Sequence, residues 1–129
     1  MTSQIFFYIV AGLVLAFILY RHFKTRSVPR LTPSQAEEKV RSGEAIFLDV
    51  RTDGEWGTDH IKGSIHIPLR SLRGRGDELK KFGRKEVICY CRTGNQSVGA
   101  AARLRTKGIN ASSLEGGIGE WNFQHRARR

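Results

Sequence analysis

The pattern of apolar and polar residues divides this chain into one unbroken apolar stretch and a longer remainder of alternating character. Residues 5–20 are apolar apart from Gly12, and the first twenty residues carry no charged side chain. Beyond them, short apolar runs alternate with polar segments whose apolar residues have helical spacing. The stretch and the remainder therefore predict different kinds of structure.

The remainder predicts three strands and a weaker fourth one. Residues 45–50 and 86–91 are short apolar runs of the type that forms buried parallel strands. Residues 64–68 form a shorter run closed by Pro68, and residues 110–117 predict the weak fourth strand. The segments between these runs are polar enough to be helices or loops.

Helices are expected between the strands. Thr32, Pro33 and Gln35 have the spacing of a capping box with proline in the first turn, and this helix is expected to reach Ser42 and stop at Gly43. The other expected helices are 69–83 (broken into two pieces at Gly74 and Gly76), 97–108 (stopped by Gly108) and 117–123, whereas 51–63 reads as a loop. Strands that alternate with helices predict βαβ units, so we expect an α/β domain with a parallel sheet flanked by helices.

Three readings of residues 5–20 are possible: a transmembrane helix, an atypical export signal and a buried core helix. Sixteen helical residues rise about 24 Å, and residues 2–4 together with outward-reaching cations extend this toward the roughly 30 Å of a bilayer core. An export signal would carry positive charge before its apolar stretch, but here the charge follows it. A core helix would be amphipathic. We therefore expect one transmembrane helix.

Three parts of the chain follow from this reading. Residues 1–23 are expected to form the membrane anchor, inserted through residues 4–20, and residues 24–30 a short linker with Pro29. Residues 31–129 are then a single domain, because about 109 residues remain after the apolar stretch, an ordinary size for one core.

All 22 Lys and Arg residues follow the apolar stretch, and the net charge is +10. The cations nearest to the stretch are Arg21, Lys24, Arg26 and Arg30. By the positive-inside rule, the domain is expected to face the cytoplasm from the inner membrane. Basic chains also bind nucleic acid or anionic lipid. No basic stripe with interleaved aromatic residues occurs, so lipid contact of residues 21–30 is favoured and nucleic acid is not expected.

Cys89 and Cys91 are the two cysteines of the chain. They are too few and too close for a disulfide framework, and no second pair of Cys or His stands at the spacing of metal ligands. A reducing compartment and a working thiol fit better. Cys89 lies within an apolar strand and is expected to be a small buried side chain.

Cys91 ends the most apolar strand and opens a loop that leads directly into a helix. Parallel sheets bind ligands at the carboxyl ends of their strands. Gly94 and Asn95 allow successive N–H groups to turn inward as an anion nest, the next helix adds its positive N-terminal end, and Arg92 adds charge. We therefore expect a lowered pKa for Cys91 and a cradle for an oxyanion or a persulfide. The alternative is a small buried side chain, as for Cys89.

Three motifs in order resemble the rhodanese family, over residues 31–123. Residues 48–68 (LDVRTDGEWGTDHIKGSIHIP) are similar to its strand ending in D-V-R, its acidic–aromatic pair and its H-I-x-G-[AS]-x-x-I-P segment. Residues 91–97 (CRTGNQS) resemble the active-site loop of single-domain thiosulfate sulfurtransferases, and residues 114–121 match the closing G-G-x-x-x-W. The chain is thus identified as a membrane-anchored member of that family.

The resemblance implies a five-stranded α/β domain that needs no cofactor and no metal. It implies that Cys91 is the nucleophile that forms the persulfide. It also implies that the backbone of the following residues is the substrate cradle. In this sequence these residues are Arg92, Thr93, Gly94, Asn95, Gln96 and Ser97.

The remaining landmarks of the family have mainly structural interpretations. Asp49 and Arg51 are expected to support the site: Asp49 orients either Arg51 or the active loop, and Arg51 forms an ion pair with Glu55. His60 is expected to bond to the backbone rather than to act as a base. Packing roles are expected for Trp56 and Trp121.

Loop length separates two chemistries. Related phosphatases and arsenate reductases have a longer loop with an arginine six residues after the cysteine, whereas Ser97 stands there in this chain. The shorter loop favours sulfur over a phosphate ester. The chain departs from the family pattern in its basic tail (residues 124–129), which replaces a glycine and a proline, and in its unusually polar last strand.

The leading hypothesis is a sulfurtransferase that takes sulfane sulfur from a small anionic donor, such as thiosulfate, and passes it to a thiol, to cyanide or to a protein acceptor. The second is a membrane-tethered persulfide carrier that docks on a protein partner through an apolar patch, for which Ile118 and Phe123 are the candidates. The third, a non-catalytic membrane adaptor, conflicts with the intact loop. The donor and acceptor in the cell and the oligomeric state stay open.

Overall fold

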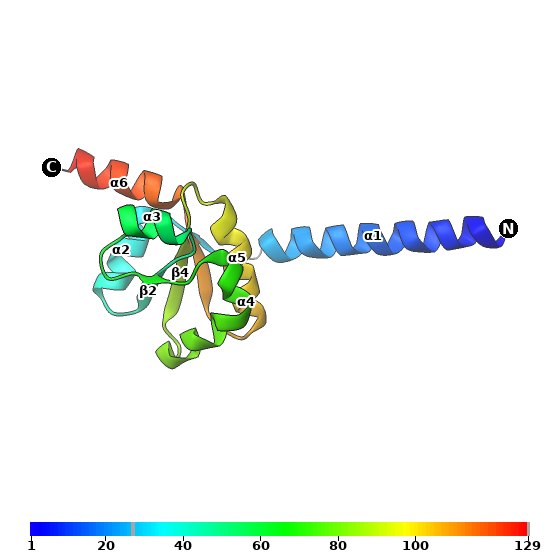
Figure 1. Cartoon of the computed structure of the whole chain (residues 1–129), viewed down its shortest axis with the longest axis horizontal. Helices are drawn as coiled ribbons and strands as arrows, with labels where there is room; N and C mark the ends of the chain where they lie inside the picture. The colour runs from blue at the N-terminus through cyan, green and yellow to red at the C-terminus, as the bar shows by residue number, and fades with distance from the viewer. Residues whose placement is uncertain (27, 129) are drawn as a thin grey trace.

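The structure is a computed structural model that describes the backbone of residues 1–26 and 28–128, with side chains for 1–23 and 28–128. An N-terminal helix, α1 (Thr2–Arg26), projects from an α/β domain (Figure 1). The expected linker, residues 24–30, falls partly outside the described residues, and so do the side chains of Lys24 and Arg26.

Five parallel strands form one sheet in the order β1-β5-β4-β2-β3. Their bounds are β1 (Arg30–Leu31), β2 (Ala45–Asp49), β3 (Ile65–His66), β4 (Glu86–Tyr90) and β5 (Ala111–Leu114). The expected α/β fold with a parallel sheet is confirmed. The two residues of β1 straddle the expected boundary between linker and domain, and so short a strand has no pattern of its own in the sequence.

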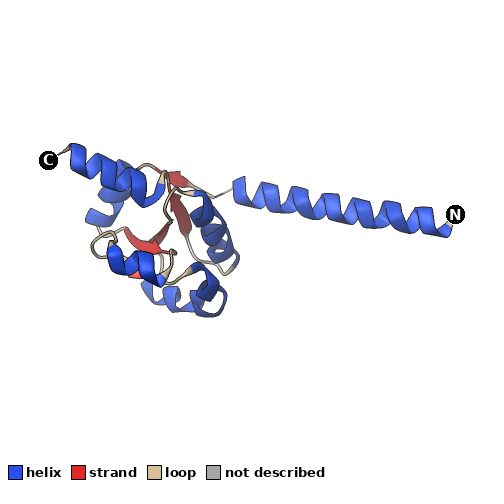
Figure 2. Cartoon of the chain, turned by 45° about the horizontal axis from the view of Figure 1, so that its top comes forward, coloured by secondary structure: helices blue, strands red, loops and turns tan. Residues whose placement is uncertain are grey.

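Helices connect and cover the strands, as Figure 2 shows. Their bounds are α2 (Pro33–Arg41), α3 (Asp53–Thr58), η1 (Leu69–Ser71), α4 (Leu72–Arg75), η2 (Gly76–Phe82), α5 (Asn95–Thr106) and α6 (Gly117–Ala127). The predicted capping box of α2 is present, since the N–H of Thr32 donates to Gln35 Oε1 at 3.0 Å and the N–H of Gln35 to Thr32 Oγ1 at 3.3 Å.

Two expectations about helices were wrong. Residues 51–63 contain α3 rather than a continuous loop, because the side chain of Thr52 caps the N–H of Glu55 and offsets the two glycines of the segment. The last helix, α6, continues beyond residue 123 to Ala127. At this end of the helix, the side chains of His125 and Arg128 contact the carboxylate of Glu37 in α2, which lies far away in the sequence.

Apolar side chains fill both faces of the sheet, as a parallel sheet requires. Adjacent strand residues point to opposite faces, so Ile88 and Cys89 of β4 belong to different core clusters. The cluster around Cys89 includes α4, η2 and α5, and the cluster around Ile88 includes α2 and α6. The sheet is thus a rigid central layer whose strand ends carry the loops.

Helix α1 lies outside this core. Every side chain from Thr2 to Phe23 is exposed, so the buried-core reading of the apolar stretch is wrong. The helix is long and apolar enough to cross a membrane, by its length and composition. A membrane span and an export signal both remain compatible with such a helix.

A buried ion pair fixes the loop that follows β2. Arg51 donates to both carboxylate oxygens of Asp49, from Nε at 3.1 and 3.0 Å and from Nη2 at 2.8 Å, and its N–H donates to Oδ1 at 2.8 Å. Arg51 Nη2 also donates to the carbonyl of Asp59 at 2.6 Å. Burial alone would lower the pKa of Arg51, but the bonds to Asp49 outweigh it and the pKa is raised. Asp49 therefore orients Arg51.

The expected pair of Arg51 with Glu55 was wrong. Asp49 ends β2 only two residues before Arg51, so both side chains meet without any loop having to close. Glu55, on α3, lies instead 3.5 Å from Arg92.

Asp49→Asn tests how much the ion pair between Asp49 and Arg51 contributes to the stability of the fold. The substitution keeps the side-chain shape but leaves the buried Arg51 charge with only the exposed carboxylate of Asp59, at 3.7 Å. We expect the free energy of unfolding to fall by about 3–5 kcal/mol, measured by chemical denaturation of the detergent-solubilised chain. Glu78→Gln breaks an exposed pair with Arg75 and is the control, with an unchanged midpoint. An equally unchanged midpoint for Asp49→Asn would contradict a stabilising role.

Candidate active site

Cys91 follows β4 directly, at the carboxyl edge of the sheet, and its side chain is buried. The strand ends one residue earlier than expected, at Tyr90. The carbonyl of Cys91 does not continue the sheet but accepts the N–H of Ile118, at the start of α6, at 2.9 Å. Cys91 therefore stands where β4, the loop into α5 and the start of α6 meet.

Backbone N–H groups of the loop converge on the sulfur of Cys91. The N–H of Gly94 donates to Sγ at 3.1 Å and the N–H of Ser97 at 3.4 Å, and Thr93 contributes a further backbone hydrogen bond. Gly94 has φ +100°, a left-handed conformation that glycine adopts without strain, and it is the N-cap of α5. This cap explains why α5 begins at Asn95, two residues earlier than expected.

Hydrogen bonding lowers the pKa of the Cys91 thiol. Burial alone would raise it, but the hydroxyl of Ser97, 3.5 Å from Sγ, and the N–H groups of Ser97, Gly94 and Thr93 all favour the charged sulfur. The opposite holds for Cys89, two residues earlier in β4. Burial raises its pKa, and the negative charge of Cys91 raises it further. One thiol is thus prepared as a nucleophile and the other is not.

The predicted cradle residues divide into those that reach the sulfur and those that do not. Thr93, Gly94 and Ser97 bond to it as described. The guanidinium of Arg92 is exposed and pairs with Glu55, so the expected charge is directed toward α3. The side chains of Asn95 and Gln96 are also exposed and form the first turn of α5.

The start of α6 holds the loop in place from its other side. Besides the bond from Ile118 to Cys91, the N–H of Gly119 donates to the carbonyl of Arg92 at 3.2 Å. Gly117 has φ +60°, and a Cβ there would lie 2.6 Å from the carbonyl oxygen of Arg92 and collide with that of Cys91. Only glycine lets the backbone of α6 approach this closely.

Comparison with known proteins identifies the arrangement. Residues 32–124 match the family described as Rhodanese-like domain. The chain belongs to the rhodanese-like family. Over 124 residues it is 32% identical to the uncharacterized protein YqhL of Bacillus subtilis, which covers 94% of this chain and 97% of YqhL.

Other relatives of the rhodanese-like domain carry sulfur-transfer names. The domain is 36% identical over 97 residues to the Mycobacterium tuberculosis protein named "Probable adenylyltransferase/sulfurtransferase MoeZ", covering 73% of this chain but 24% of MoeZ. The solved structure of a rhodanese-related protein from Thermoplasma volcanium has a TM-score of 0.67 and 30% identity, over 74% of this chain and 92% of that one. Sulfur transfer in general is therefore supported for this domain.

Sequence reasoning missed one residue of the rhodanese-like site, Ser113. Its hydroxyl lies 2.7 Å from the hydroxyl of Ser97, and its side chain is 1% exposed. A chain of two buried hydroxyl groups thus leads from β5 to the sulfur. The sequence offered one signal, the unusual polarity of the strand, because a buried hydroxyl needs a partner.

Other expectations about the rhodanese-like domain have clear outcomes. His60 bonds to the backbone, Nδ1 to the carbonyl of Trp56 at 3.0 Å, and Trp121 packs edge-on against Phe47, as predicted. Ile118 is buried, so the prediction that it belongs to an exposed apolar patch was wrong. Within the described residues, no group of three His, Cys, Asp or Glu side chains is placed to hold a metal ion.

Ser113→Ala tests the hydroxyl pair. When Cys91 is ionised, the Ser97 hydroxyl donates to sulfur and accepts from Ser113, so removing Ser113 weakens the bond to the thiolate. We expect the pKa of Cys91 to rise and its alkylation by iodoacetamide at pH 6.5 to slow by about 2- to 10-fold, the size of one net hydrogen bond.

Ser112→Ala is the matched control. Ser112 precedes Ser113 in β5, is equally buried, but donates to Glu86 Oε2 at 3.1 Å. Its removal should leave the alkylation rate unchanged. Equal slowing in both variants would mean that general destabilisation, not the hydroxyl pair, controls the thiol.

Proposed function

We propose that this protein is a membrane-anchored sulfurtransferase that accepts sulfane sulfur on Cys91 from a small anionic donor such as thiosulfate. It then passes the sulfur to a thiol, on a small molecule or a protein, or to cyanide. The observation that carries the proposal is the convergence of the Gly94 and Ser97 N–H groups on the Cys91 sulfur.

The cradle suits both states of such a cycle. The thiolate of Cys91 attacks the outer sulfur of thiosulfate, the sulfur–sulfur bond of the donor breaks, and sulfite leaves with its electron pair. The product, Cys91–S–S⁻, carries the negative charge one atom further out, toward the same N–H groups and the N-terminal end of α5. An acceptor thiolate then attacks this outer sulfur and Cys91 returns as the thiolate. Splitting one transfer into two displacements is ordinary covalent catalysis.

Phosphate ester hydrolysis fits the loop less well. The sixth position after the cysteine is Ser97, which is buried and bonded to Ser113 rather than directed at a ligand.

A persulfide carrier for a protein partner is the second candidate, with the same chemistry. Phe123 of α6 favours it, because its side chain is 69% exposed. The buried Ile118 leaves Phe123 without the neighbour that was expected to complete an apolar patch.

We propose further that α1 crosses the inner membrane once, through residues 4–20, with residues 31–129 as the domain on the cytoplasmic side. Its exposed apolar surface supports a span, and the cluster of cations that follows the apolar stretch supports this orientation. Cytoplasmic placement also keeps Cys89 and Cys91, both free thiols, in a reducing compartment.

Thiosulfate should load Cys91. Incubation of the full-length chain in detergent should add the mass of one sulfur atom to the peptide that contains Cys91, and cyanide should remove it as thiocyanate. Because the pKa of Cys91 is lowered, loading should persist as the pH falls below about 8.5, the usual cysteine value, and decline only through the lowered pKa. Cys91→Ser should abolish both steps and Cys89→Ser should retain them. Thiocyanate formation by Cys91→Ser would contradict the assignment.

Membrane topology can be tested by fusion. An alkaline phosphatase moiety joined after Arg129 should be inactive, because that enzyme needs export to fold, and a cytoplasmic reporter at the same site should be active. The intact chain should keep its first twenty residues when its mass is measured. An active phosphatase fusion, or a mature chain that lacks residues 1–20, would contradict the anchor.

A further inference from the structure

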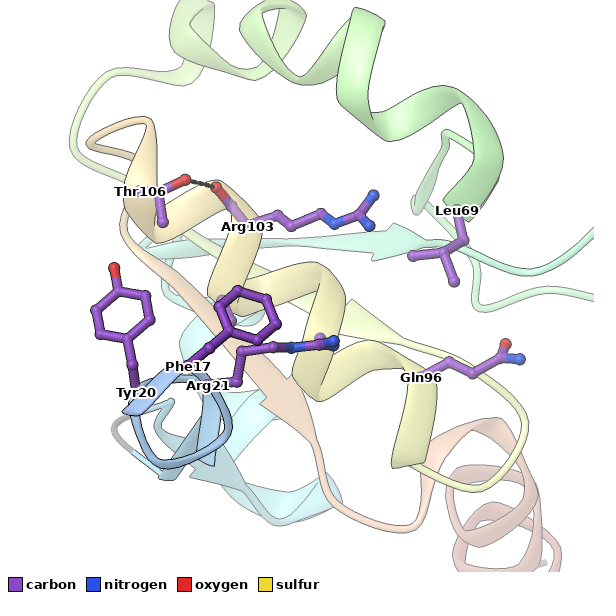
Figure 3. A pocket seen from close by; sticks show the side chains of 9 residues that line it. Phe17, Tyr20, Arg21, Leu69, Gln96, Arg103 and Thr106 are labelled. Carbon is purple, nitrogen blue, oxygen red and sulfur yellow. Dashed lines mark hydrogen bonds between the residues drawn. The ribbon is translucent and has the colours of Figure 1, made fainter. Parts of the chain in front are cut away.

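A cavity of about 410 Å³ lies between the end of α1 and the outer face of α5 (Figure 3). Phe17, Tyr20 and Arg21 line it from α1, and residues from Gln96 to Thr106 line it along nearly the whole of α5. The rhodanese-like site does not need this cavity, although Gln96 belongs to the loop of Cys91 as well. The position of the cavity between the apolar helix and the domain suggests a ligand that has both an apolar and a polar part.

The connection between α1 and the domain is short. Helix α1 ends at Arg26, and two residues later Val28 is buried in the core cluster that contains Val98 and Ala102 of α5. Two residues span at most about 7 Å. The end of α1 is therefore tied to the side of the domain on which α5 lies, and α5 is the helix that faces the membrane if α1 spans it.

The depth of the cavity follows from the point at which the apolar stretch ends. Residues 4–20 are the proposed inserted part, and Arg21, the first charged residue after them, marks the level of the headgroups. Phe17 lies about 6 Å before Arg21 along the helix axis. The headgroup layer is itself about 5–8 Å thick on each side. The cavity thus lies across the boundary between acyl chains and headgroups, and α5 runs across the end of α1 at that level (Figure 1).

The lining has the chemistry of a phospholipid site. Its apolar wall includes the rings of Phe17 and Tyr20, and Arg21 and Arg103 supply guanidinium groups from the two helices (Figure 3). Arginine binds phosphate oxygens in pairs, and tyrosine is typical of the membrane interface. None of the nine described residues that line the cavity is acidic, so nothing there matches the cation of a choline or ethanolamine headgroup.

We propose that this cavity binds the headgroup of an anionic phospholipid of the membrane in which α1 is anchored. The proposal rests on the membrane anchoring put forward above. Arg21 and Arg103 hold the phosphate, and the aromatic rings contact the glycerol and the first acyl carbons. The lipid joins α1 to α5 and holds the domain against the bilayer. Because Gln96 lines the cavity and follows Cys91 in the same loop, sulfur transfer then takes place at the membrane surface.

Photo-crosslinking in nanodiscs tests this directly. The full-length chain, with p-benzoylphenylalanine in place of Thr106, is placed in nanodiscs of equal phosphatidylcholine and phosphatidylglycerol. Mass spectrometry then gives the ratio of the two lipids in the adducts. We expect phosphatidylglycerol to be enriched in the adducts, because Arg21 and Arg103 both attract the anionic lipid. Arg103→Gln should lower the enrichment by about 5-fold, the typical effect of one basic residue near an anionic membrane surface.

Arg41→Gln is the control. Arg41 is an exposed arginine in the last turn of α2, a helix on the other face of the sheet, and its loss should leave the enrichment unchanged. Adducts in the bilayer ratio, or no lipid adducts at Thr106, would overturn the lipid site. A chain that does not enter nanodiscs would overturn the anchor instead, and thiosulfate loading of Cys91 in the same nanodiscs reports on sulfur transfer separately.

Discussion

Backbone N–H groups that point at the sulfur of Cys91 are the interaction on which the rest of the domain depends. A charge buried at the end of a strand is costly unless hydrogen bonds stabilise it. Here the stabilising groups are Gly94, Ser97 and Thr93, held between a helix that begins with a left-handed glycine and another that packs against the loop carbonyls. The sheet sets the position of Cys91, and α5 and α6 set the loop around it.

This cradle stabilises negative charge with fixed dipoles rather than with a cationic side chain. Arg92 is turned toward α3, and the hydroxyl of Ser97 is supported by Ser113. In the proposed reaction with thiosulfate, a neutral cradle could release the sulfite dianion, whereas a buried arginine would hold it. The large positive charge of the chain is therefore not needed at the sulfur. In the proposed arrangement part of it acts at the membrane surface, at the junction of α1 and α5.

The sequence predicted most features that depend on neighbours along the chain and missed those that depend on distant contacts. The capping box at Thr32, the apolar central strands and the nest after Cys91 are local patterns, and all were found. Helix α3 was missed because its glycines masked the cap at Thr52. The partner of Arg51 was misassigned because several acids lie close to it in sequence, and spacing alone did not favour Asp49, two residues before it, over Glu55. The role of Ser113 needs β5 to lie beside α5, which no local pattern gives.

The pH dependence of alkylation at the two cysteines tests the central claim most directly. With limiting iodoacetamide on the folded chain, followed by peptide mass mapping, Cys91 should be modified first, and its rate should level off at a pH below about 8.5, the usual cysteine pKa, because the thiolate is already formed there. Cys89, whose pKa burial raises, should react only on unfolding. Equal modification of both cysteines, or a Cys91 rate that keeps rising with pH up to or beyond the usual value, would contradict a thiolate stabilised by the loop.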